Sequence, residues 1–134
     1  MSGLGVDLVH VPGFAAQLAQ PGSRFPSVFT VGERAEAVRR MLDGDRLAAY
    51  WAARWGAREA LVKAWSSVLF GQAPPAGDDV LGQIEVATDA WGRPRLVLHG
   101  EVADALAAYD HQVSLSHDGD HAIAVVLLEE RRSS

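Results

Sequence analysis

The chain has 134 residues, a length typical of one domain, and its 49% apolar and 22% charged residues exclude a disordered chain. It contains no cysteine, which excludes disulfides, thiol nucleophiles and cysteine-ligated zinc or iron–sulfur centres. The formal net charge is −5, from 12 Lys and Arg against 17 Asp and Glu, so nucleic acid is a poor candidate partner. We expect a cytoplasmic protein with no membrane partner, because no signal-peptide pattern and no run of about 18 apolar residues is present.

The N-terminal third predicts one strand followed by two helices. Val and Leu at positions 5–11 favour a β-strand, and Pro12 opens a short helix over 12–20. Thr30 and Glu33 have the spacing of a capping box, in which the hydroxyl and the carboxylate each accept from a backbone N–H at the helix start. A second helix is therefore expected over residues 31–42.

The central segment, residues 46–65, predicts a long helix of high intrinsic propensity. On a helical wheel the large apolar side chains fall on one broad stripe, formed by Leu47, Tyr50, Trp51, Trp55, Leu61, Val62 and Trp65. The opposite side is mostly small, with Ala49, Ala52, Ala53, Gly56, Ala60 and Ala64. Because no face is an ordinary solvated one, we expect a central helix whose small side is pressed against a sheet.

The C-terminal half predicts antiparallel strands around one short helix. After a Gly/Pro loop at 71–82, the expected elements are strands 83–88 and 95–99 around the turn 91–94, a helix 100–109, and strands 112–117 and 122–128 around the turn 118–120. The strand 122–128 is almost continuously apolar, which is typical of a central position. The whole chain, residues 1–134, is expected to form one α+β domain, with an antiparallel sheet packed on the long central helix.

Charged residues interrupt the apolar pattern of the central helix. Arg54 and Arg58 lie in the aromatic stripe, while Glu59 and Lys63 lie at the edge of the small face. Burying such groups unpaired costs several kcal/mol, so the arginines need anionic partners. One interpretation is a set of internal salt bridges, in which Glu59 pairs with Lys63 and each arginine pairs with an acid elsewhere. The other is a cluster of cations that binds phosphates, with a carboxylate among them for a metal ion.

Asp7 is a lone carboxylate inside the first apolar strand. It could be a buried hydrogen-bond acceptor, or it could form a two-carboxylate Mg²⁺ site together with Glu59. Magnesium typically takes one or two carboxylates, with waters and substrate phosphates as its other ligands. The cations of the central helix would then hold the remaining phosphate oxygens.

His117 ends a predicted strand and is followed by Asp118. A histidine in such a place is often a plain surface residue. It could also bind a phosphate or accept a proton, with Asp118 orienting the imidazole.

The motifs GVDLV, RWGAREALVKAW, WGRP and VSLSHDGDHAIAVV together resemble holo-[acyl-carrier-protein] synthases, the small single-domain 4'-phosphopantetheinyl transferases, over residues 5–129. The tryptophan after KA and the DAWGRPRL turn are most similar to the actinobacterial members. The resemblance implies the fold of these transferases and the movement of the phosphopantetheine arm of coenzyme A onto a serine of an acyl carrier protein. It also implies Mg²⁺, release of adenosine 3',5'-bisphosphate, and a homotrimer with active sites between subunits.

The same resemblance implies roles for individual residues. Metal ligands would be Asp7 and Glu59; catalytic residues Glu59, His117 and Asp118; and coenzyme A ligands Arg54, Arg58, Lys63, Arg93, Pro94 and His117. The base that accepts the serine proton is left open between Glu59, His117 and a water. A different function class, a noncatalytic trimeric module that binds a nucleotide or phosphate, would use the cations but not the carboxylate pair.

Three departures from the family pattern affect these roles. Arg58 stands where the family usually has lysine, and the two are not equivalent phosphate partners. Gln112 stands where the family often has histidine, and His111 is one place earlier, on the other face of the strand. The first helix lacks the arginines that bind the acidic carrier in many members, and we expect Arg24 or the pair 39–40 to substitute.

Overall fold

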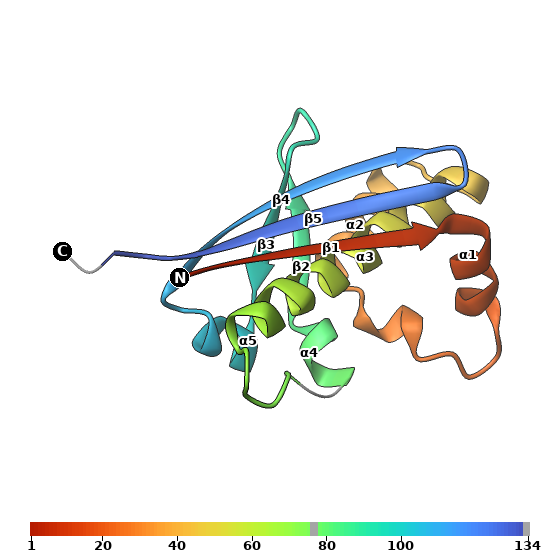
Figure 1. Ribbon diagram of the computed structural model, residues 1–134. Coiled ribbons are helices and arrows are strands. Elements are labelled where there is room, and N and C mark those ends of the chain that lie inside the picture. The colour runs from red at the N-terminus through yellow and green to blue at the C-terminus, as the bar shows by residue number, and fades with distance from the viewer. Residues whose placement is uncertain (76–77, 133–134) are drawn as a thin grey trace.

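The computed structural model describes residues 1–75 and 78–132, and its centre is a three-stranded antiparallel sheet (Figure 1). The strand order is β1 (Ser2–His10), β5 (His121–Glu130), β4 (Tyr109–Asp118). The prediction that the apolar C-terminal strand is central is therefore confirmed. Alternate residues of β5 point into the core and are almost fully buried: Ala122, Ala124, Val126 and Leu128.

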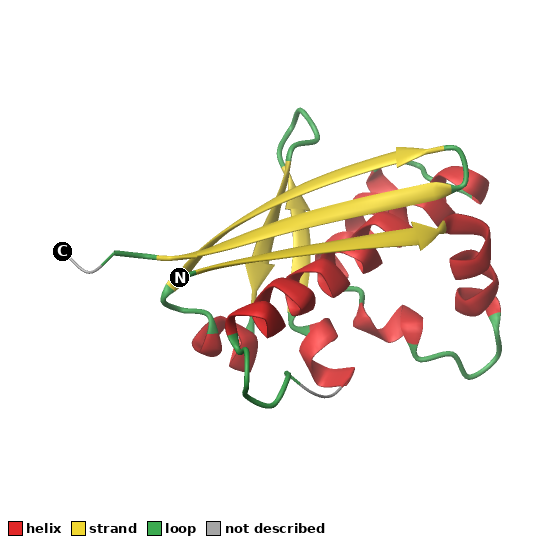
Figure 2. Ribbon diagram, in the orientation of Figure 1, coloured by secondary structure: helices red, strands yellow, loops and turns green. Residues whose placement is uncertain are grey.

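One long helix, α3 (Gly44–Val68), runs along one face of this sheet and contacts all three strands (Figure 2). A separate two-stranded hairpin pairs β2 (Ile84–Thr88) with β3 (Pro94–Leu98). The remaining helices are α1 (Val11–Ala19), the 3-10 helix η1 (Phe25–Val28), α2 (Val31–Arg39), α4 (Asp78–Gly82) and α5 (Gly100–Ala105). The α+β fold with an antiparallel sheet on a long helix is confirmed.

The small side of α3 faces β1 at very short range. A Cβ added to Gly5 would lie 1.9 Å from the backbone oxygen of Ala60, and one added to Gly3 would lie 2.3 Å from that of Ala64. Only glycine lets the strand approach the helix backbone this closely. This contact explains why α3 carries alanine where most helices carry larger residues.

Gly5→Ala is therefore expected to lower the free energy of unfolding by about 1–3 kcal/mol, as overpacking in a filled core does. Urea unfolding followed by tryptophan fluorescence measures the change. Gly82→Ala is the matched control, because no described atom lies within 4 Å of a Cβ built there. Equal stability of the two variants would contradict the close-approach explanation.

The outer face of the three-stranded sheet is apolar and exposed. Its exposed side chains are Leu4, Val6 and Leu8 on β1 and Ile123 and Val125 on β5. A contiguous apolar face of this kind marks an interaction surface. Among the described residues, no helix is both long and apolar enough to cross a membrane.

The structure differs from the sequence expectations at the smaller elements. Helix α4 lies in the segment 71–82 that was expected as a loop, of which residues 76 and 77 lie outside the described part of the chain, and η1 lies between the first two expected helices, where no element was predicted. Helix α2 ends at Arg39 and not at residue 42, since Met41 adopts a left-handed backbone with φ of 54°. The capping box of Thr30 and Glu33 is present as expected.

Candidate functional site

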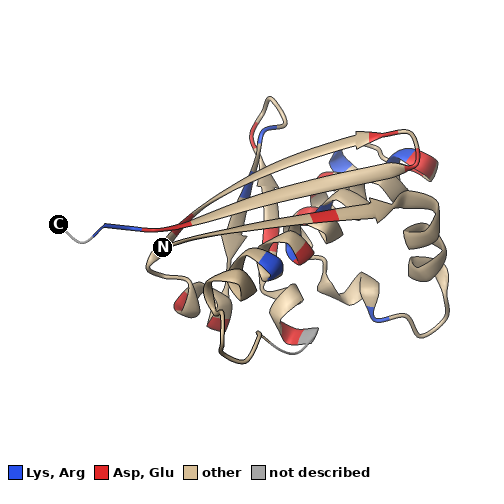
Figure 3. Cartoon of the chain, in the orientation of Figure 1, with Lys and Arg blue, Asp and Glu red and all other residues tan. Residues whose placement is uncertain are grey.

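Two carboxylates and a lysine meet between β1 and α3. Asp7 is one of the inward positions of β1, and Glu59 and Lys63 lie one helical turn apart on α3. Figure 3 shows charged positions on β1 and along α3 within largely uncharged ribbon. Asp7 and Glu59 line the same open cavity of about 350 Å³, whose other walls include His10, Gly13, Phe14, Gln17 and Trp55. We call this cavity the carboxylate pocket.

Lys63 lies beside this pocket and pairs with one of its carboxylates. Lys63 Nζ lies 3.0 Å from Asp7 Oδ1 and also donates to the backbone oxygen of Val6 at 3.0 Å. Burial and then the negative charge of Asp7 raise the pKa of Glu59, and the charge of Lys63 opposes them. Lys63 therefore forms its ion pair with Asp7, and not with Glu59 as the salt-bridge interpretation expected.

A carboxylate pair of this kind fits Mg²⁺. Within residues 1–75 and 78–132 no group of three or more histidine and acidic side chains could hold a metal by itself. Magnesium does not require one, because it is commonly held by one or two carboxylates and completes its shell with water and substrate phosphates. Oxygen donors from Asp7 and Glu59, at a cavity open to solvent, match that preference.

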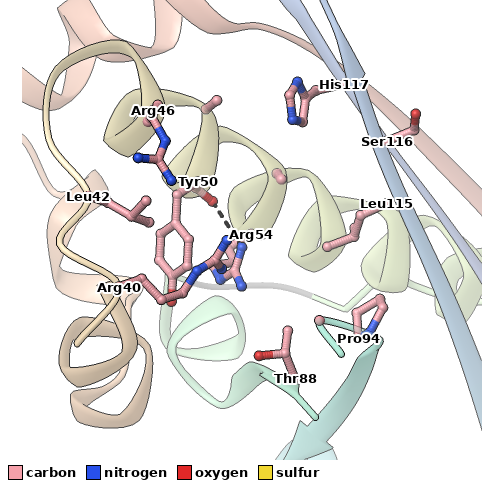
Figure 4. Close-up of a pocket in the computed structure, with 13 residues that line it drawn as sticks. Arg40, Leu42, Arg46, Tyr50, Arg54, Thr88, Pro94, Leu115, Ser116 and His117 are labelled. Atoms are coloured by element: carbon pink, nitrogen blue, oxygen red, sulfur yellow. Dashed lines mark hydrogen bonds between the residues drawn. The ribbon is translucent and has the colours of Figure 1, made fainter. Parts of the chain in front are cut away.

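A second cavity, of about 380 Å³, is rich in cations and lies between α3, the hairpin and β4 (Figure 4). We call it the cationic pocket. Its charged or titratable lining residues are Arg40, Arg46, Arg54 and His117, and its other lining side chains include Tyr50, Thr88, Pro94, Leu115 and Ser116. Convergent arginines and a histidine suit a phosphorylated ligand.

Arg54 is 5% exposed, and its surroundings satisfy it only in part. Its Nη2 is 3.6 Å from Glu36 Oε2, and its Nε has no hydrogen-bond partner among the described residues. Burial lowers the pKa of Arg54, while the side chains of Tyr50 and Glu36 raise it. A buried guanidinium with an unmatched donor is unusual. The terminal nitrogens of Arg54 also have only long contacts, Nη1 at 3.5 Å from the backbone oxygen of Tyr50 and Nη2 at 3.6 Å from Glu36 Oε2.

Glu36, behind the cationic pocket, makes stability sensitive to acid. Burial alone raises the pKa of Glu36, but the hydrogen bond from Thr88, the charge of Arg54 and two further partners outweigh it and lower the pKa below 4.5. A lowered carboxyl pKa contributes stability that is fully present above the unfolded value and is lost as pH falls through the folded value.

We therefore expect the wild type to lose stability as pH falls below about 4.5 more steeply than Glu36→Gln does. Urea unfolding at a series of pH values from neutral downward measures both slopes. Parallel curves for the two proteins would contradict the lowered pKa.

Arg58 does not reach either cavity. Its side chain is 0% exposed and forms a two-pronged ion pair with Glu33, with Nη2 at 2.5 Å from Oε1 and Nη1 at 2.9 Å from Oε2. Its remaining bonds go to the backbone oxygens of Val28, Arg54 and Leu81. This placement disagrees with the expectation that Arg58 binds coenzyme A. The salt-bridge interpretation of the sequence instead describes the two pairs Arg58–Glu33 and Arg54–Glu36.

The other expected site residues are divided between the two cavities and the hairpin. Pro94 lines the cationic pocket, but Arg93 lies at the exposed hairpin tip, where its Nε bonds Asp89 Oδ2 at 2.6 Å. Asp118 follows His117 in β4 and lies opposite His121 of β5 in the strand register. Neighbouring strand residues point to opposite faces, so the expected orientation of His117 by Asp118 does not form here.

The two cavities open on different sides of α3. Arg54 and Glu59 are five residues apart, which places them about 140° apart around the helix. Within residues 1–75 and 78–132, the carboxylate pair and the arginine cluster therefore lie in two separate cavities.

Several residues of the cationic pocket were not expected from the sequence. Arg40, Arg46, Thr88 and Tyr50 line it, and Glu36 stands behind it. The sequence places Tyr50 in the aromatic stripe of the central helix and Arg46 at the first residue of that helix, and neither position indicates a ligand. For Glu36 the sequence did contain a signal. Two arginines in a buried stripe require acidic partners, and Glu33 and Glu36 lie on the preceding helix.

Comparison with known proteins identifies the family of the chain. The family model of the 4'-phosphopantetheinyl transferase superfamily matches residues 3–126. The chain belongs to this superfamily. It is 49% identical over 127 residues to the holo-[acyl-carrier-protein] synthase of Mycobacterium ulcerans, covering 95% of both chains, and 48% identical over the same length to that of Mycobacterium tuberculosis.

Solved structures of the same family superpose on nearly the whole chain. A complex described as "Chronobacterium ammoniagenes ACPS-CoA complex" has a TM-score of 0.87 and 42% identity, covering 98% of this chain and 99% of its own. The acyl carrier protein synthase of Mycobacterium tuberculosis has a TM-score of 0.78 and 43% identity, covering 96% and 97%. The expectation of an enzyme of the actinobacterial holo-[acyl-carrier-protein] synthase type is confirmed.

Proposed function

We propose that this protein transfers the 4'-phosphopantetheine arm of coenzyme A to a serine of an acyl carrier protein and releases adenosine 3',5'-bisphosphate. The observation that carries the proposal is the Asp7–Glu59 pair beside Lys63. A module that only bound anions would gain nothing from two carboxylates next to phosphates. The names of the curated relatives and the coenzyme A complex of a similar structure support the same substrates.

The chemistry is a phosphoryl-type displacement. The serine oxygen bonds the β-phosphorus of coenzyme A, the bond from that phosphorus to the bridging oxygen breaks, and the bisphosphate leaves with the electron pair. The serine proton passes to a base, for which Glu59 and His117 are the two side-chain candidates. Mg²⁺ held by Asp7 and Glu59 would neutralise the diphosphate and its leaving group.

The basic side chains of α3 and of the cationic pocket then have different roles in this reaction. Lys63, whose side chain is 54% exposed, keeps Asp7 in place and can donate to a phosphate oxygen at the same time. The cationic pocket binds phosphate groups of coenzyme A through Arg46, Arg54 and His117, beside Pro94. Arg58 acts on the site only through the packing of α3 against α2.

The transfer is tested by incubating an apo acyl carrier protein with coenzyme A and the enzyme and measuring the mass of the carrier. We expect a mass increase by one phosphopantetheine group that requires Mg²⁺ and is lost in EDTA. Binding of coenzyme A without any mass increase on carriers of fatty acid or polyketide systems would favour the alternative, a noncatalytic nucleotide-binding module. A melting temperature raised by coenzyme A and Mg²⁺, but not by ATP, would report the site independently.

His117→Ala separates binding from proton transfer. We expect a KM for coenzyme A raised by about tenfold with kcat nearly unchanged, because the imidazole faces the cationic pocket and the carboxylate pair lies elsewhere. Initial rates at several coenzyme A concentrations and pH values give both constants. A kcat lowered by about a hundredfold, with loss of one limb of its pH profile, would instead assign His117 as the base.

The proposal includes a homotrimer with active sites between subunits. Its support is that the two cavities open on different sides of α3, while the sheet exposes the apolar face of Leu4, Val6 and Leu8. Light scattering should give three copies for the wild type, and Leu4→Lys should give monomers without transfer activity. Val38→Lys, an exposed apolar position on α2, is the control and should stay trimeric.

Three further expectations remain part of the proposal. Residues 1–134 act as one domain, the enzyme works in the cytoplasm, and the acidic carrier contacts Arg24 or the pair 39–40. Reversing the charge of Arg39 should raise the KM for the carrier and leave that for coenzyme A unchanged; no change in either would remove Arg39 from the docking surface.

A further inference from the structure

The guanidinium of Arg54 is held between an aromatic ring and a carboxylate. Its central carbon lies 3.5 Å from the centre of the Tyr50 ring, closer than any other cation–ring contact among the described residues. On another side, Glu36 Oε2 is 3.6 Å from its Nη2. Cation–π contacts that are shielded from water contribute up to about 2 kcal/mol, so the ring is a substantial part of what holds Arg54 in place.

Tyr50 is itself fixed in orientation. Its hydroxyl donates to the backbone oxygen of Glu33 at 2.8 Å and contacts Glu36 Oε2 at 3.2 Å. Burial raises the pKa of Tyr50 to about 12 against the opposing charge of Arg54, so the hydroxyl remains a donor at neutral pH. Thr88 donates to the other oxygen of Glu36 at 2.6 Å. The ring, the carboxylate and the hairpin thus form one connected support behind the cationic pocket.

Arg54 differs from Arg58 in what this support leaves unsatisfied. The nitrogens of Arg58 all have close acceptors, as in a structural ion pair. Arg54 has one long contact to the backbone oxygen of Tyr50, at 3.5 Å, one loose pair with Glu36, and an Nε without a partner in the described part of the chain. Its guanidinium is oriented by its neighbours but retains capacity for an anion in the pocket that it lines.

We propose that Tyr50 is a positioning residue for coenzyme A: its ring holds the Arg54 guanidinium in the wall of the cationic pocket, in place for a phosphate group. The inference rests on the proposed function. Preorganisation is the physical reason, because a guanidinium already held in place loses less conformational freedom when the ligand binds. Tyr50 acts through Arg54 and takes no part in the bond-making step.

The test compares two substitutions that leave the net charge unchanged. Tyr50→Met replaces the ring by a flexible apolar side chain, and Tyr50→Phe keeps the ring but removes the hydroxyl. We expect Tyr50→Met to raise both the KM and the equilibrium Kd for coenzyme A by about threefold to tenfold, with kcat within about twofold of wild type. Tyr50→Phe should keep a KM close to wild type. Thermal unfolding identifies the folded variants, and Tyr50→Leu takes the place of Tyr50→Met if the latter does not fold.

A double-mutant cycle shows whether the effect passes through Arg54. In an Arg54→Ala background, Tyr50→Met should change the Kd by less than about 1.5-fold. An unchanged Kd in the folded single variant, or an equal loss in the Arg54→Ala background, would overturn the positioning role. If the wild type neither binds coenzyme A nor modifies a carrier, the proposed function fails as well. If the wild type does both, and the Kd of Tyr50→Met for coenzyme A equals that of the wild type, only the Tyr50 proposal is overturned.

Discussion

Glu59→Gln is expected to lower the rate of phosphopantetheine transfer at limiting Mg²⁺ by about a hundredfold, because the neutral amide is a poor ligand for this cation. The glutamine has the shape of the glutamate, and it removes a carboxylate whose pKa is raised by burial and by Asp7. The fold should therefore persist, with a melting temperature at neutral pH at or above that of the wild type. The measurement is the rate of transfer across a range of Mg²⁺ concentrations.

The control for this experiment is Glu101→Gln, which removes an exposed acid of α5 that lines neither cavity. It should keep wild-type rates at every Mg²⁺ concentration. A Glu59→Gln variant that turned over as fast as this control at limiting Mg²⁺ would remove Glu59 from the metal site. Asp7→Asn should behave as Glu59→Gln does, but it should also release Lys63 from its ion pair.

The second large effect concerns stability. Arg58→Met is expected to lower the free energy of unfolding by about 3–5 kcal/mol, because it leaves Glu33 charged and without its ion-pair partner in a site that is 1% exposed. Urea unfolding measures this change. The double variant Arg58→Met with Glu33→Gln should be less destabilised than Arg58→Met, since no uncompensated charge remains buried.

Arg131 supplies the matched control, because its ion pair with Asp110 is exposed. Arg131→Met should cost less than about 1 kcal/mol. Similar losses for Arg58→Met and Arg131→Met would mean that the buried pair contributes no more than a surface pair. Arg58→Lys is informative as well: one ammonium cannot reproduce the fork that reaches Glu33, Val28 and Leu81 together.

The larger elements could be predicted because their patterns are long and have one physical cause. The alanine face of α3 predicted a close contact with a sheet, and Gly3 and Gly5 supply the other half of that contact. The apolar run of β5 predicted a central strand, and β5 lies between β1 and β4 with alternate residues buried on the side of α3. Short elements such as η1 and α4 carry too few residues for a periodic signal, and tertiary contacts decide them.

The carboxylate pocket was predictable and the cationic pocket only in part. Asp7 and Glu59 stand out because each is an acid in an apolar element. Arg54 and Arg58 have the same local surroundings in the sequence, four residues apart on one helix, yet one lines a cavity and the other is enclosed. The difference comes from Glu33 and Glu36, which face α3 from a helix whose angle no local pattern specifies. Long-range partners of this kind separate a structural arginine from one that can bind a ligand.

The pairing of β1 with β5 has a consequence for how the enzyme is made. Asp7 and its register partner Ala124 are 117 residues apart in the chain. The contact is of very long range along the chain, and such contacts form late because closing the loop costs entropy before any pairing compensates it. The sheet position of Asp7 is therefore expected to be fixed only when β1 pairs with residues 121–130, so a chain truncated before β5 should hold the arginine-bearing helix with β1 unpaired.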